Sequence, residues 1–221
     1  MTAIVVSQGV VDGLVPLQSF AVPFPVQARS SGRLQIEHDL QLSQQRPHQI
    51  DRQHAAIKLY LAKVTQRSLS EADALRTQEL LGACVKLEHV GDIVVRNMLA
   101  HVRKKAERGL EFTPEGWSEL LAFHNSVMAN ARLAFNVLVS RDAETARTIV
   151  HEKDRLRDLE KRSSQSHFLR LRDGTAKSVE TSSIHLDTIR DLKQINSLLA
   201  SIAYPVLEEH GLLSGTRLKA V

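Results

Sequence analysis

The stretch that decides the fold runs from Ser70 to Gly109 and reads SEADALRTQELLGACVKLEHVGDIVVRNMLAHVRKKAERG. It opens with a hydroxyl residue followed three positions later by an acid, Asp73, which is the pattern of a capping box at a helix start. Apolar residues then recur at helical spacing as far as His101, and no proline interrupts them. A long amphipathic helix is therefore predicted, ending near Gly109.

The chain after residue 48 carries the same kind of signal elsewhere. Pro114 is the only proline between His48 and Tyr204, and it follows Thr113, which places a capping hydroxyl before a proline at the first helical position. Helical spacing predicts helices over 48–66, 113–139, 142–173 and 176–209, with Pro205 bending or ending the last, and a short helix over 34–45. Because short connections join long helices, we predict an all-α, antiparallel helical bundle.

Composition agrees with this fold class. The chain has 221 residues, of which 43% are hydrophobic and only 4% aromatic, and such low aromatic content does not favour a β-sandwich or barrel. The single cysteine, Cys84, rules out an internal disulfide and fits the reducing cytoplasm. The net charge of +4 is small, and no aromatic residue interleaves the basic run at 103–108, so no nucleic-acid partner is expected.

The first 47 residues differ from the rest. They contain four of the six prolines, and the first 28 residues carry one charged side chain, Asp12. Glycines and prolines break the roughly 20 continuous apolar residues that a spanning helix needs, and no Lys or Arg precedes Arg29, as a secretory signal would require. We predict that residues 1–47 form a poorly ordered or atypical segment and that 214–221 form a tail.

Two pairs of acids could carry chemistry. Glu88 and Asp92 lie four residues apart, and helical geometry predicts that they point toward an apolar face; that face comprises Leu81, Cys84, Val85, Val95 and Leu99. Because desolvating a carboxylate is costly, such a pair calls for a metal ion or a cation such as Arg96. Asp187 and Asp191 repeat the spacing in more polar surroundings. Each pair is open to two interpretations: a site for iron or another hard divalent cation, or salt-bridged or solvated acids without a ligand.

Enzymatic alternatives have weaker support. A di-iron bundle enzyme needs Glu-x-x-His motifs, and the nearest approach here is Asp51-x-x-His54. His89 and His185 flank the acid pairs, and their angular positions predict surface or interface residues. No glycine-rich phosphate loop and no nucleophile–base pair is evident, so a metal-dependent helical-bundle enzyme and a metal-free helical adaptor stay as alternatives.

A family resemblance adds to this picture. The segments 87–97 and 182–196 resemble the E-x-x-x-D signatures of PhoU-like domains, although the second begins with Asp instead of Glu. Segments 56–61, 114–117 and 203–206 are similar to the PhoU-like domain at the cytoplasmic end of bacterial sodium/phosphate cotransporters. The two acid pairs recur 99 residues apart, each with an asparagine five positions after its second acid (Asn97 and Asn196). The resemblance covers 48–213.

The resemblance implies a fold and a function. It implies two three-helix repeats, about 48–110 and 114–210, the first without a clear opening helix. It also implies a non-enzymatic regulatory or accessory domain in phosphate uptake and homeostasis, as a detached or truncated cytosolic part of a cotransporter. Its expected partners are a membrane phosphate transporter, or its membrane domain, and a second copy in a homodimer; its expected place is the cytoplasm, at the inner face of the membrane. The metal, iron or another divalent cation, would be held by Glu88, Asp92, Asp187 and Asp191.

Overall fold

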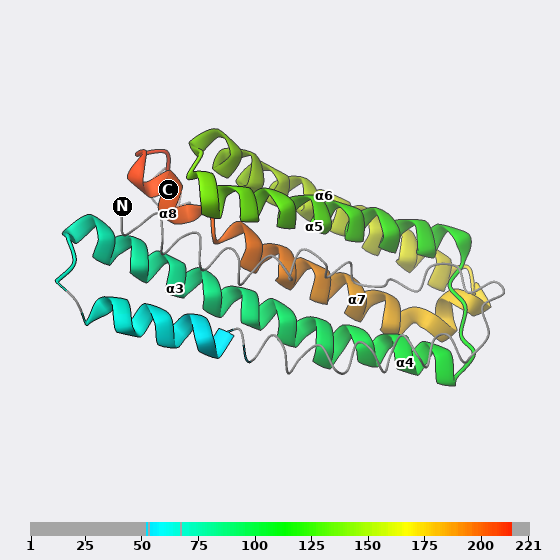
Figure 1. Ribbon diagram of the computed structural model, residues 1–221. Coiled ribbons are helices and arrows are strands. Elements are labelled where there is room, and N and C mark those ends of the chain that lie inside the picture. Colours follow the sequence, from blue (N-terminus) through cyan, green and yellow to red (C-terminus); the bar gives the residue numbers. More distant parts are fainter. Residues whose placement is uncertain (1–51, 53, 67, 214–221) are drawn as a thin grey trace, which may run out of the picture.

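The computed structural model describes residues 52, 54–66 and 68–213, and the helix expected over 34–45 lies outside them. Its elements are helical residues 54–65, α3 (Glu71–Asp92), the π-helix η1 (Ile93–Met98), α4 (Leu99–Glu107), α5 (Pro114–Ser140), α6 (Ala143–Arg172), α7 (Ala176–Ala200) and α8 (Tyr204–Glu209) (Figure 1). These ranges contain no strand, so the all-α prediction is confirmed.

Capping side chains fix three helix starts. The hydroxyl of Ser70 accepts a hydrogen bond from the backbone amide of Asp73 at 3.1 Å, and the hydroxyl of Thr113 accepts one from Gly116, also at 3.1 Å. The carboxylate of Asp142 does the same for the amide of Thr145 at 2.7 Å. Each bond satisfies one of the amides that a helix start leaves free, so the predicted starts are confirmed.

The helix ends also follow local chemistry. Gly109 and Gly174 have φ of 61° and 68°, a left-handed conformation that glycine adopts without a steric penalty. The helix predicted over 176–209 is two helices: α7 ends at Ala200, and α8 begins at Tyr204 with Pro205 in its first turn. The break lies a few residues before the proline, which is tolerated in the first turn of α8 because the amide that it lacks would have no partner within the helix.

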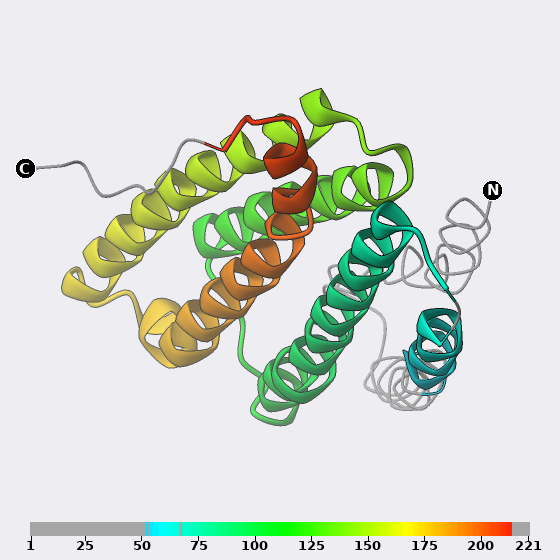
Figure 2. The same cartoon turned by 90° about the vertical axis from the view of Figure 1, so that its left-hand side faces the viewer.

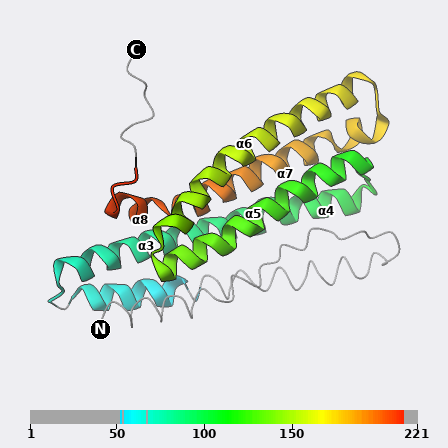
Figure 3. The ribbon, with the colours of Figure 1, turned by 90° about the horizontal axis from the view of Figure 1, so that it is seen from above.

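The helices pack as an elongated bundle around α7. In Figure 1, α7 lies between α3–α4 on one side and α5–α6 on the other, and α7 contacts all four of these helices. Viewed at right angles, α3 and α6 lie on opposite sides of α7, with the helical residues 54–65 beyond α3 (Figure 2). From above, the long helices run side by side, with α8 at one end (Figure 3). Successive long helices are antiparallel, as predicted.

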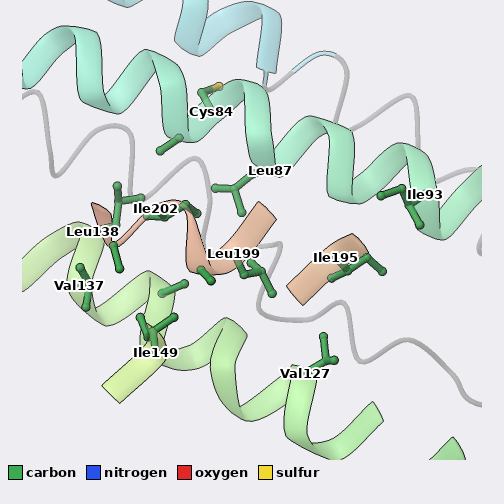
Figure 4. Close-up of a cluster of buried hydrophobic side chains, with 14 of the residues drawn as sticks. Cys84, Leu87, Ile93, Val127, Val137, Leu138, Ile149, Ile195, Leu199 and Ile202 are labelled. Atoms are coloured by element: carbon green, nitrogen blue, oxygen red, sulfur yellow. The ribbon is translucent and has the colours of Figure 1, made fainter. Parts of the chain in front are cut away.

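The core is continuous along this bundle. One buried cluster joins side chains from four elements: Leu87 of α3, Ile93 of η1, Val127 of α5, and Ile195 and Leu199 of α7 (Figure 4). Leu80, Leu120 and Phe123 have no exposed surface. Burying each such side chain contributes on the order of 2 kcal/mol, so tertiary packing is the main source of helix stability here. Of the helices described, none combines the length and the apolar character needed to cross a membrane.

Candidate functional site

The first acid pair lies at the end of α3, beside the core but not within it. Glu88 is half-buried, and the side chain of Asp92 is 36% exposed and forms an ion pair with Arg96, whose Nη2 lies 3.3 Å from Oδ1. The apolar face predicted for these carboxylates is only partly buried: Cys84 and Leu99 are 2% and 6% exposed, whereas Leu81 and Val85 are 38% and 47% exposed. The buried side of α3 is centred elsewhere, on Leu80, Ala83, Leu87 and Gly91.

The second acid pair has one buried and one open member. The side chain of Asp191 is 1% exposed. It contacts Nε2 of His101 at 2.9 Å and accepts a bond from Nδ2 of Asn97 at 3.3 Å. Asp187 is 37% exposed and pairs with Arg190, whose Nη1 lies 2.8 Å from Oδ1. Asp191 is therefore a polar link between α7 and the η1–α4 segment. Of the two helix faces that carry acid pairs, its face is the more polar in sequence, yet Asp191 is the more buried carboxylate in the structure.

A π-helix brings these partners to Asp191. In η1 the amide of Leu99 bonds the carbonyl of Val94, five residues earlier, instead of four. The wider turn shifts the register of everything after it relative to α3, and π-helical turns often occur at functional sites. Asn97 and His101, four residues apart, then share the face that meets α7. Sequence periodicity gives no sign of this turn, which is why His101 was missed.

Further polar contacts join the same helices. Nζ of Lys86 donates to the carbonyl of Ser201 at 3.0 Å, at the end of α7. Nζ of Lys104 donates to the hydroxyl of Ser183 at 3.0 Å, near its start. Asp191 lies between these two contacts, so it is the buried centre of a polar seam that runs along α7.

The two acid pairs form separate sites. Across the residues that the structure describes, no group of three or more His, Cys, Asp and Glu side chains is arranged to hold one metal ion. Each pair could therefore supply two carboxylates and would need other ligands, such as water, to complete the oxygen coordination of a hard cation. The recurrence of asparagine is also unequal, because Asn97 donates to Asp191 whereas Asn196 accepts from Nδ2 of Asn130 at 2.8 Å.

A partly buried charged cluster in the second half of the chain was not predicted. Glu119 of α5 and Arg170 of α6 form a two-pronged ion pair, with N–O distances of 2.7 and 2.8 Å. Ser163 donates to the same carboxylate at 3.0 Å. Burial alone would raise the pKa of Glu119, but the bonds from Arg170 and Ser163 outweigh it and the pKa is lowered. This cluster fastens α5 to α6.

Two stacked histidines complete the cluster. The rings of His167 and His185 are nearly parallel, with centroids 4.6 Å apart, and Nε2 of His185 lies 3.4 Å from the Glu119 carboxylate. Burial lowers the pKa of both, that of His185 to about 4. His185 is 1% exposed, so its predicted surface position is wrong. The apolar Ile189 and Leu192 lie four and seven residues after His185 and therefore share its helix face, and this spacing was the available signal.

Gly116 lies where the start of α5 approaches this cluster closely. A Cβ atom on Gly116 would lie 3.2 Å from Oγ1 of Thr113 and 3.7 Å from both the Arg170 guanidinium and Nδ1 of His185. The first of these contacts is with the hydroxyl that caps α5. Gly116 therefore lets the start of α5 sit directly against the charged cluster.

Fold and site together define a class: a helical bundle whose acidic signatures lie on two long helices, with polar contacts between those helices. Residues 120–206 match the PhoU domain family. This match confirms the predicted resemblance to PhoU-like domains for these residues.

Relatives and solved structures agree. The chain is 36% identical over 156 residues to proteins named "Putative inorganic phosphate export protein YjbB" from Escherichia coli (strain K12) and Salmonella typhimurium. The match covers 71% of this chain but only 29% of those relatives. Its fold is similar to the crystal structures of PhoU from Pseudomonas aeruginosa (TM-score 0.69, 17% identity, 95% of this chain and 90% of that one) and of the phosphate transport system regulatory protein PhoU from Streptococcus pneumoniae (0.68, 15%, 96% and 94%).

Proposed function

We propose that this chain is a regulatory or accessory domain in phosphate transport and homeostasis, and that it acts by protein contact without catalysis. The observation that carries the proposal is the 36% identity over 156 residues to relatives named as phosphate export proteins. The match covers 29% of those relatives, which are named as phosphate export proteins, and the partner that we propose is a membrane phosphate transporter or its membrane domain. A homodimer and a place at the inner face of the membrane belong to the same proposal.

Phosphate flux tests this function. Cells that express the chain should take up or release radioactive phosphate at a rate at least about twofold different from cells with an empty vector. Leu192→Asp is the matched control, because it places a charge at a position that is 1% exposed and should unfold the bundle. Equal flux with and without the folded chain would contradict the proposal.

The origin as a detached or truncated part of a sodium/phosphate cotransporter has its own test. The DNA upstream of the coding sequence should contain a reading frame for a membrane domain. A phosphate-unrelated frame there, together with no copurification of the chain with a membrane domain of that family, would refute this origin while leaving a regulatory role intact.

Metal binding is the second part of the proposal, with iron or another divalent cation at the acid pairs. The geometry favours Glu88 and Asp92, because Glu88 is half-buried and Asp92 is 36% exposed and pairs with one exposed arginine. Asp191 already contacts His101, Asn97 and Arg190. Elemental analysis of protein purified without a histidine tag separates a metalloprotein from a metal-free adaptor. Turnover that depends on the bound metal would favour the alternative of a helical-bundle enzyme.

A further inference from the structure

An apolar groove of about 570 Å³ opens between α3 and η1 on one side and α5 on the other. Leu87 and Val94 line one wall, Met128 and Phe135 the other, and Leu192 and Ile195 of α7 form the floor. Apolar side chains from three sides thus face one space. In a four-helix bundle, a fourth helix would fill such a space.

The outer surface of α5 continues this groove and is unusually poor in charge. From Leu120 to Ser140, Arg132 is the only Asp, Glu, Lys or Arg residue, and Val139 on the groove wall is 49% exposed. α6 is the opposite: its 30 residues include eight Lys or Arg and five Asp or Glu. Because water is a poor environment for a contiguous apolar surface, the α5 side is the one that needs a cover.

Arg132 is the one charged side chain on the groove. Within the described ranges it forms no ion pair, and neither do Arg103 of α4 and Arg162 of α6; Arg132 differs from these two in lying on an apolar groove. A suitable cover is therefore apolar with a single acid placed to meet this guanidinium.

The chain itself contains a segment of that composition. Residues 1–28 carry a single charged side chain, the acid Asp12. Their glycines and prolines interrupt the continuous apolar helix that would be needed to span a bilayer. We propose that residues 1–28 cover the groove between α3 and α5, with Asp12 facing Arg132. Residues 1–28, which are atypical in composition, then bind a surface of their own chain. Binding there removes their apolar side chains from water.

Photo-crosslinking of the full chain tests the occupant without assuming a register. A benzophenone amino acid replaces Met128 in the groove, and mass spectrometry identifies the peptide to which it attaches; the control places it at Arg155, whose side chain is 74% exposed on α6. Peptides from residues 1–28 should dominate for the first position and be missing for the second. Mixing isotopically light and heavy chains should show attachment within one chain at every protein concentration.

The other results overturn the proposal. Attachment between light and heavy chains would make a second copy the occupant, and attachment to other parts of the same chain, or none, would leave residues 1–28 away from the groove. If the substituted chain fails to fold, as judged by circular dichroism, Val139 provides a second position on the groove wall.

A charge exchange tests the contact of Asp12 with Arg132. Arg132→Glu and Asp12→Lys should each lower Tm by at least about 2 °C, a shift readily measured for a domain of this size, and the double variant should recover at least half of the combined loss. Arg155→Glu combined with Asp12→Lys is the control and should show no recovery. Strict additivity in the first pair would overturn the assigned contact.

Discussion

The two acid pairs have the same spacing and opposite environments. Asp92 is 36% exposed and pairs with an arginine one turn along its own helix, whereas Asp191 is 1% exposed and contacts side chains of another helix. An exposed pair of the first kind contributes little to stability, while a buried carboxylate with three partners, His101, Asn97 and Arg190, is costly to disturb. A repeated motif therefore supplies an open pair in one half of the chain and a structural link in the other.

The largest expected difference is in stability. Asp191→Ala should lower the free energy of unfolding by about 3 kcal/mol, because it leaves His101 and Asn97 without their acceptor in a buried interface. Asp92→Ala should cost less than about 1 kcal/mol. Urea unfolding monitored by circular dichroism measures both, and equal losses would remove the distinction between the pairs.

Acid sensitivity should come from the half that contains the second pair. Burial lowers the pKa of His185 from 6.5 to about 4, so between these pH values the unfolded chain binds a proton that the folded chain does not. Stability should therefore fall by up to about 3 kcal/mol as pH drops from 6.5 to 4, with no further loss from this group below that. Urea titrations at several pH values should show a flatter profile for His185→Asn, and an unchanged one for the exposed His151→Asn. An unaltered slope in His185→Asn would contradict the assignment.

Metal-dependent stabilisation should distinguish the pairs next. With a cation at about 100 times its Kd, preferential binding to the folded state adds about 2.7 kcal/mol. We expect Glu88→Gln with Asp92→Asn to abolish this gain, and Asp187→Asn with Asp191→Asn to lower basal stability but keep the gain. Calorimetric melts with chelator and with added metal check this. Loss of the gain only in the second double variant would reverse the assignment.

The smallest effect concerns Arg96. Its ion pair with Asp92 is exposed, so Arg96→Gln should change stability by less than about 1 kcal/mol. Removal of the competing cation should nevertheless strengthen metal binding at Glu88 and Asp92 several-fold, as measured by isothermal titration calorimetry. Arg103→Gln, at an exposed position on α4, is the matched control. Weaker binding in Arg96→Gln would show that the arginine supports the site.

Local signals were sufficient for the starts of the long helices and for two of the chain reversals. The capping residues Ser70, Thr113 and Asp142 each begin a helix as predicted, because a cap depends on residues within one turn. Glycine at 109 and 174 marks chain reversals for a similarly local reason. The acidic signatures also identified the PhoU-like domain, since they are read directly from the order of residues.

Only the tertiary structure decided what those signatures do. Helical periodicity assumes 3.6 residues per turn, and the π-helix η1 breaks that assumption exactly where Asn97 and His101 turn toward Asp191. Contacts such as Glu119 with Arg170, 51 residues apart in the chain, have no local pattern at all. The sequence by itself determined the helices and the family resemblance, because these depend on neighbouring residues. The burial and the partners of each carboxylate depend on which helices meet, and only tertiary packing determines which helices meet.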